Sequence, residues 1–66
     1  MEPTHIYLLT GEDWEDTIIY LTKEDAIKAS IDNPFYRVEI FSKSDNHSGY
    51  TPTYNYYCEG KLYQLH

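Results

Sequence analysis

Residue types that build disulfide frameworks, phosphate-binding loops and nucleic-acid surfaces are scarce in this 66-residue chain. Cys58 is its only cysteine, so no intrachain disulfide can form, and a reducing cytoplasm is the expected location. None of the three glycines lies in a Gly-rich phosphate loop. Only five lysines and arginines are present against eleven acidic residues, which disfavours direct binding to a DNA or RNA backbone.

Residue groupings typical of catalysis or metal binding are also missing from the sequence. The histidines, His5, His47 and His66, are scattered and form neither a metal-ligand spacing nor a catalytic triad. The acidic residues do not follow the D-x-[DN]-x-[DN]-G spacing of a calcium-binding loop. We therefore expect no catalytic residue, no metal and no cofactor, and a protein that is not an enzyme.

Long apolar runs are absent as well. The run from Ile6 to Leu9 is far too short for a signal peptide or a membrane span, so the chain is expected to stay in the cytoplasm. At this length, residues 1–66 should form a single domain with a marginal core that neither a disulfide nor a metal reinforces. Homodimerisation through a sheet edge or face is therefore one expectation, and a monomer is the other.

The charge is distributed unevenly along the chain. Residues 1–33 contain eight acidic and two basic residues, whereas residues 34–66 contain three of each, so the net charge of −6 lies in the first half. The acidic first half of the chain would be attracted to a basic protein surface. The alternative interpretation is that the charge only keeps a small protein soluble.

The first half predicts two strands and a helix. Residues 5–9 and 17–21 are β-prone and apolar at successive positions, which indicates strands covered on both faces. Thr22 is the expected N-cap of a helix that ends before Pro34 and docks on the sheet. The narrow apolar stripe of this helix would consist of Ala26, Ile27 and Ile31.

The second half predicts three more strands. Residues 35–42 alternate, and residues 54–58 and 61–65 flank a two-residue turn at Glu59 and Gly60. Pro52 should keep the start of its strand at an edge or outside the ladder. In the alternating strand, one face would carry Tyr36, Val38 and Ile40, and the other Phe35, Arg37, Glu39 and Phe41. The predicted fold is α+β, in the order ββαβββ, with one mostly antiparallel sheet and one helix packed on a face.

The most unusual segment is residues 12–16, where four carboxylates surround the only tryptophan, Trp14, in a predicted hairpin loop. As an interface, Trp14 would be a buried anchor with an electrostatic rim of carboxylates. Alternatively, Trp14 folds back as a lid on the core and the carboxylates are only solvated. The predicted partner-binding residues are Glu12, Asp13, Trp14, Glu15 and Asp16, together with Glu24 and Asp25 at the start of the helix.

Tyrosine is the second unusual feature, because five of the eight tyrosines fall in the last 17 residues. Tyrosine suits interfaces and dimer seams, since it buries apolar area and keeps a hydroxyl group, but it is also simply a good strand residue. The predicted dimer or ligand surface consists of Tyr54, Tyr56, Tyr57 and Tyr63. A nucleotide stacked there would need positive charge from Arg37, Lys43 or Lys61.

Three segments together give the chain a resemblance to small, acidic orphan proteins encoded by bacteriophages. These segments are Ile6 to Thr10, Thr22 to Ala26, and the Tyr-rich terminal hairpin with its Glu59–Gly60–Lys61 turn. The resemblance implies a protein that binds and disables a host protein in the host cytoplasm. Several such proteins compete with nucleic acid for a basic host surface, such as that of a nucleoid protein. No family residue can be assigned to a position in this chain.

The leading hypothesis is therefore a non-enzymatic, DNA-mimic-like interaction module whose acidic half binds and blocks a basic, nucleic-acid-binding host protein. One alternative is a protein that sequesters a small ligand or nucleotide on a Tyr-rich dimer surface. Another is a structural or assembly subunit that pairs through its sheet edges.

Overall fold

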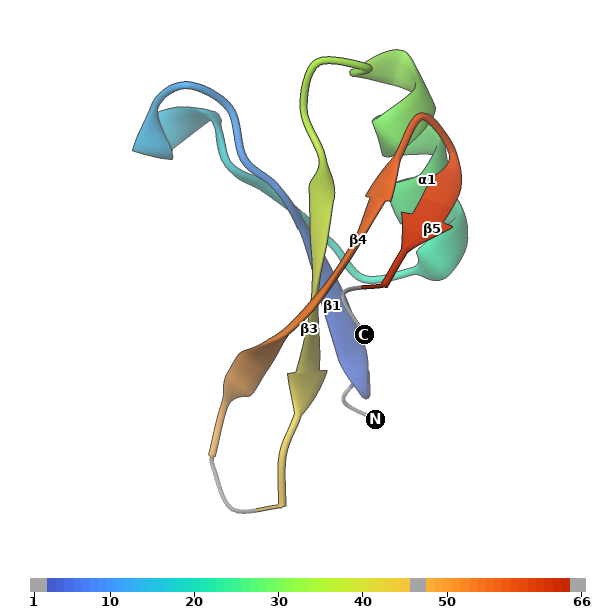
Figure 1. Cartoon of the computed structure of the whole chain (residues 1–66). Coiled ribbons are helices and arrows are strands. Elements are labelled where there is room, and N and C mark those ends of the chain that lie inside the picture. Colours follow the sequence, from blue (N-terminus) through green and yellow to red (C-terminus); the bar gives the residue numbers. More distant parts are fainter. Residues whose placement is uncertain (1–2, 46–47, 65–66) are drawn as a thin grey trace.

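The computed structural model describes residues 3–45 and 48–64, which form one sheet of five strands and one α-helix (Figure 1). The strand order is β2-β1-β3-β4-β5, and every neighbouring pair is antiparallel. This arrangement confirms the predicted α+β fold and the order ββαβββ. The elements are β1 (His5–Leu9), a 3-10 turn η1 (Trp14–Asp16), β2 (Ile18–Tyr20), α1 (Lys23–Asp32), β3 (Val38–Lys43), β4 (Tyr50–Cys58) and β5 (Lys61–Tyr63).

Helix α1 starts and ends where the sequence predicts. The Thr22 Oγ1 accepts a hydrogen bond from the Asp25 backbone N–H at 3.3 Å, and the side chain of Asn33 donates to the Ala29 carbonyl at 2.9 Å. The predicted apolar stripe is wrong at Ile31, which is exposed. Ala29 and Ser30 are buried instead. The small side chains let the helix lie close to the sheet.

Among the described residues, no helix is long and apolar enough to cross a membrane.

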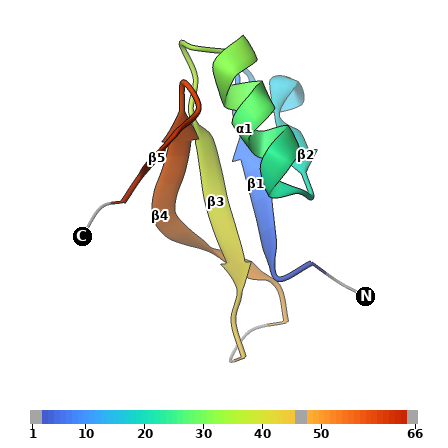
Figure 2. The same ribbon diagram turned by 90° about the vertical axis from the view of Figure 1, so that its right-hand side faces the viewer.

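The core lies between α1 and one face of the sheet (Figure 2). Leu9 pairs with Val38, and Val38 pairs with Tyr57, so one row of side chains crosses the three central strands beneath the helix. Tyr36, Tyr7 and Ile27 pack at its margin. In the part of the chain that the structure describes, the buried apolar residues are Leu9, Ala26, Ala29, Val38, Ile40 and Tyr57. Six residues are a small core, which agrees with the marginal stability expected at this length.

The boundaries of the later strands differ from the prediction. β3 starts at Val38 rather than residue 35, because Pro34 and the residues after it form the turn out of α1. β4 starts at Tyr50 rather than residue 54 and includes Pro52, which pairs with Phe41. Proline fits there because β5 pairs only with Tyr56–Cys58 and leaves this part of β4 as a sheet edge.

A bulge interrupts β4 opposite Ile40. The pairing of β3 with β4 shifts register between Glu39 and Phe41, and Tyr54 adopts a positive φ of 67° there. The Thr53 hydroxyl donates to the Ile40 carbonyl at 2.8 Å and accepts from the Asn55 N–H at 3.2 Å, so a side chain replaces part of the ladder. Tyr54, the first residue of the predicted strand 54–58, therefore departs from regular strand geometry.

The β4–β5 turn confirms the predicted two-residue hairpin. Glu59 and Gly60 have φ values of 52° and 81°, as such a turn requires. The Gly60 N–H donates to the Ser30 hydroxyl at 2.9 Å, which fastens the turn to α1. β5 ends at Tyr63, two residues before the predicted end, and Leu65 lies outside the described residues.

The side of the sheet opposite α1 is not covered by any element in residues 3–45 and 48–64 (Figure 2). The prediction that β1 and β2 would be covered on both faces is therefore wrong within a single copy of the chain, for the residues that the structure describes. We call this side the open face and define it by the apolar residues that the strand pairing places on it. These residues are Ile6, Leu8, Ile19, Phe41, Tyr50, Pro52, Tyr56, Cys58 and Tyr63.

Candidate functional site: an acidic cleft at one end of the sheet

The segment of residues 12–16, which we call the acidic loop, connects β1 to β2 at one end of the sheet (Figure 1). Backbone hydrogen bonds from Asp16 N to Asp13 O at 3.0 Å and from Thr17 N to Trp14 O at 3.2 Å fold it into η1. Gly11 permits the loop to close, because a Cβ there would lie 2.7 Å from the Asp16 Cβ. The loop is therefore a compact turn whose residues 12–16 are exposed.

The four carboxylates of the acidic loop are exposed and have no partner within the described part of the chain. The ion pair of Arg37 with Glu39 lies away from the loop, on β3 and the turn before it. No lysine or arginine occurs before Lys23 in the sequence. Within residues 3–45 and 48–64, no side chain neutralises the negative charge of the loop, which is therefore available to an external cation or basic side chain.

Trp14 is 87% exposed and lies at the start of η1. The alternative that it folds back as a lid on the core is therefore wrong. A second large aromatic residue, Phe35, is 93% exposed in the α1–β3 connection, which lies at the same end of the sheet (Figure 1). The sequence prediction missed Phe35 as a surface residue because the alternation of residues 35–42 placed it in a strand. Its position directly after Pro34 was the available signal for a turn.

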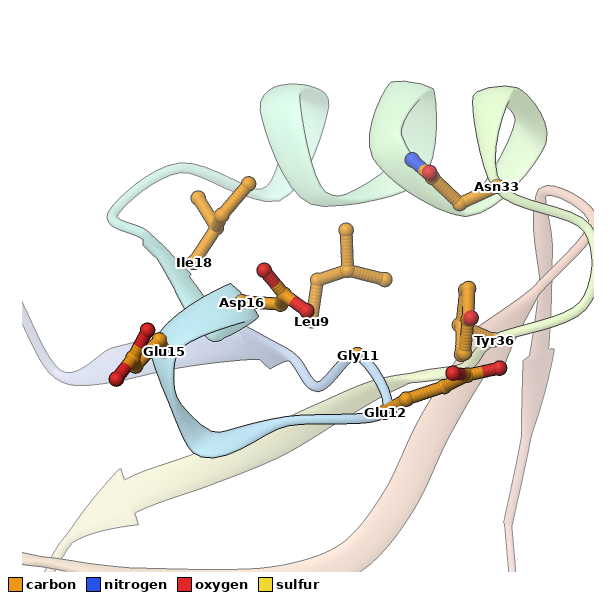
Figure 3. A pocket seen from close by; sticks show the side chains of 8 residues that line it. All are labelled: Leu9, Gly11, Glu12, Glu15, Asp16, Ile18, Asn33 and Tyr36. Atoms are coloured by element: carbon orange, nitrogen blue, oxygen red, sulfur yellow. The ribbon is translucent and has the colours of Figure 1, made fainter.

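A cleft of about 570 Å³ separates the acidic loop from the C-terminal end of α1 (Figure 3). Glu12 extends in the direction of Tyr36, and Asp16 projects over Leu9 (Figure 3). The residues that line this acidic cleft are Leu9, Gly11, Glu12, Glu15, Asp16, Ile18, Asn33 and Tyr36. Three carboxylates above an apolar floor suit a long cationic side chain, whose methylene groups need apolar contact and whose head group needs anions.

Glu24 and Asp25 do not join the acidic cleft. They lie in the first turn of α1, whereas the cleft lies beside its last turn, about 15 Å away for a ten-residue helix. Asp25 instead lines a separate, shallower recess between α1 and β2, together with Tyr20, Lys28, Ala29 and Asp32. The seven predicted partner-binding residues therefore form two separate groups, and the loop group is the one with a cleft.

The four predicted tyrosines of the dimer or ligand surface are also divided. Tyr57 is 6% exposed and belongs to the core, which corrects its assignment to a surface. Tyr56 and Tyr63 stack on each other with ring centroids 5.1 Å apart, and the Arg37 guanidinium lies 4.7 Å from the Tyr56 ring centre. Tyr54 is exposed at the bulge. Because Tyr56 already stacks on Tyr63 and contacts Arg37, the arrangement does not favour nucleotide stacking on this ring.

Tyr7 and Tyr57 form a further aromatic contact, with ring centroids 6.2 Å apart. Burial, and secondarily the neighbouring Tyr57, raises the pKa of Tyr7 above its ordinary value of 10.0. The recess beside these rings measures about 190 Å³, below the usual range for small-molecule sites.

Among residues 3–45 and 48–64, no group of three or more histidine, cysteine or acidic side chains is arranged to hold a metal ion. Comparison of the chain with protein family models, curated proteins and solved structures finds no match. The acidic loop and its cleft are therefore the features of this chain that bear on its function.

Proposed function

We propose that this chain is a non-enzymatic, acidic interaction module that binds a basic, nucleic-acid-binding protein and occludes its nucleic-acid surface. The observation that carries the proposal is the exposed Trp14 among four unpaired carboxylates, in the loop that lines the acidic cleft. The resemblance to bacteriophage proteins makes a host protein in the bacterial cytoplasm the proposed partner. A loop used only for solubility would not need a large, exposed aromatic residue at its centre.

Encounter would be steered by charge. The net charge of −6 and the absence of lysine and arginine before Lys23 give the loop end of the molecule a negative field. A basic surface that normally binds phosphates is attracted to such a field, and the attraction weakens as salt screens it.

Tight binding would require desolvated contacts in addition to charge. Trp14 and Phe35 are large, exposed aromatic residues at this end, and burial of such residues supplies the anchors of many interfaces. A partner lysine or arginine would enter the acidic cleft, lay its methylene groups against Leu9 and Tyr36, and place its cationic head between the carboxylates of Glu12 and Asp16.

A capture experiment with two matched variants tests this proposal. The loop-neutralised variant carries Glu12→Gln, Asp13→Asn, Glu15→Gln and Asp16→Asn. The control-neutralised variant carries Glu24→Gln, Asp25→Asn, Asp45→Asn and Glu59→Gln, and therefore has the same net charge. Each tagged protein is incubated with bacterial lysate at low and high salt, and the retained proteins are identified by mass spectrometry.

We expect the unmodified chain and the control-neutralised variant to retain the same basic, nucleic-acid-binding protein at low salt and to lose it at high salt. The loop-neutralised variant and Trp14→Ala should not retain it. Equal retention by both neutralised variants would show that the loop is not the binding surface. Retention of no basic protein by the unmodified chain would contradict the proposal itself.

A further inference from the structure

The open face is more apolar than a solvent-facing side of an antiparallel sheet usually is. Two rows of paired residues cross it. One row runs from Ile19 through Leu8, Glu39 and Tyr56 to Tyr63, and the other connects Ile6, Phe41 and Pro52. A sheet with one solvated face normally alternates apolar and polar residues along each strand. Here β1 carries apolar residues on both faces, which is typical of a strand whose two faces both pack against other structure.

The margins of the open face remain accessible. Ile19 is 57% exposed on the edge strand β2, and Tyr63 is 43% exposed on the opposite edge strand β5. Leu8 and Phe41, on the central strands, are half-buried only by their neighbours within the sheet. An interface of standard size needs about 800 Å² from each partner, which is about one sixth of the 5098 Å² surface of this chain.

Charge distinguishes the open face from the rest of the molecule. Strand register places Lys43 and Lys61 on this face. Arg37 joins them through its ion pair with Glu39 at 2.6 Å and its contact with the Tyr56 ring, and Glu39 is the acidic residue of the face. The acidic loop lies beyond the end of the strands. Two chains of net charge −6 repel each other, and a face that carries three basic side chains and one acidic side chain adds little to this repulsion.

We propose that the open face packs against the same face of a second copy of this chain. The two sheets would form a sandwich with α1 of each copy on the outside and with both acidic loops left free. The small core explains why the second copy is needed, since six buried apolar residues give a 66-residue domain little stability. The aliphatic residues Ile6, Leu8 and Ile19 favour this occupant over nucleic acid, which uses aromatic stacking and dense positive charge.

This inference is independent of the proposed function, and salt separates the two. Binding of a basic partner weakens as salt is added, because opposite charges attract. Self-association of two acidic chains strengthens as salt is added, because screening reduces their repulsion.

Adjacent residues on the edge strands provide matched controls for the test. Ile19 points to the open face, whereas Ile18 pairs with Leu9 on the helix side and is 48% exposed. Tyr63 points to the open face, whereas Leu62 pairs with Tyr57 on the helix side and is 49% exposed. Lysine is introduced at each of these four positions in turn, and circular dichroism establishes that each variant is folded.

Sedimentation equilibrium of the untagged chain and these variants, from micromolar to submillimolar concentration, measures the dimer dissociation constant. We expect a dimer whose Kd falls with added sodium chloride. Ile19→Lys and Tyr63→Lys should raise Kd about tenfold or more, because symmetry places each substitution in the interface twice. Ile18→Lys and Leu62→Lys, which make the same change in net charge, should not raise Kd.

Two results would overturn the inference. A monomer at every concentration would show that no second copy occupies the open face, which would then be left for a different chain. A dimer that is weakened equally by both members of each lysine pair, or by neither member, would place the contact elsewhere, for example at a sheet edge.

Discussion

Replacement of Ser30 by alanine tests how the terminal hairpin is attached to the rest of the fold. Ser30 is fully buried, and its hydroxyl donates to the Ile27 carbonyl at 2.7 Å and accepts from the Gly60 N–H at 2.9 Å. Among the described residues, the hydroxyl of Ser30 provides the side-chain hydrogen bond that joins α1 to the β4–β5 turn. Ser30→Ala removes the acceptor and leaves the Gly60 N–H without a partner.

The expected loss of stability follows from two opposing terms. An unsatisfied, part-buried donor costs about 1–3 kcal/mol, and alanine is better than serine in a helix by about 0.5 kcal/mol. Ser30→Ala should therefore lower the free energy of unfolding by about 1–2 kcal/mol, which corresponds to a Tm decrease of about 4–8 °C per kcal/mol in a domain of this size.

Urea unfolding at one fixed protein concentration measures this difference, and amide hydrogen exchange locates it. The Gly60 amide and the amides of β5 should exchange faster in Ser30→Ala, whereas amides in the pairing of β1 with β3 should change only with the global stability. An unchanged free energy of unfolding, together with unchanged exchange at Gly60, would refute the role given to this hydroxyl.

Further predictions concern the turn, the core tyrosine and the exposed tryptophan. Gly60→Ala should destabilise the protein by about 1–2 kcal/mol, because φ is 81° and the added Cβ would lie 3.0 Å from Ile31 Cγ1; unfolding in urea measures this, and an unchanged midpoint would be evidence against it. The pKa of Tyr7 is raised in the folded state, so the neutral Tyr7 phenol stabilises the folded protein. This contribution to the free energy of unfolding is fully present below about pH 10 and is lost as pH rises through the folded-state pKa. Spectrophotometric titration should show one late-ionising tyrosine that Tyr7→Phe removes, and an identical titration in that variant would contradict the assignment. Relative to free N-acetyltryptophanamide, Trp14 should be quenched more efficiently by caesium and less efficiently by iodide at low ionic strength, because the surrounding carboxylates attract cations and repel anions; the same caesium-to-iodide ratio as in the free compound would mean that the field is weak.

Much of the fold could be predicted because local signals and global packing agree. Thr22 and Pro34 mark the helix ends, and Glu59 with Gly60 marks the hairpin, each through backbone chemistry that depends on a few adjacent residues. The fold class and element order follow from these marks. The β4 bulge could not be predicted, since it depends on a hydrogen bond between Thr53 and Ile40, which lie on different strands.

The candidate site was only partly predictable for the same reason. The acidic loop and Trp14 stand out in the sequence as a local cluster, and the structure shows that this loop borders a cleft. Tyr36 and Asn33 line that cleft from the opposite side, because α1 packs on the sheet and ends beside the loop. The spacing of apolar residues along the sequence does not show this placement. Burial of Tyr57 depends on the pairing of β3 with β4, and the sequence gives no local sign that separates it from Tyr56.

The most direct test of occlusion is the displacement of duplex DNA from the basic protein that the chain retains. DNA carrying a fluorophore is bound to that protein at low salt, and its anisotropy is followed as the chain or a variant is added. We predict stoichiometric release by the unmodified chain and by the control-neutralised variant, and no release by the loop-neutralised variant at the same concentrations. Binding without release of DNA, or equal release by both neutralised variants, would contradict occlusion by the acidic loop.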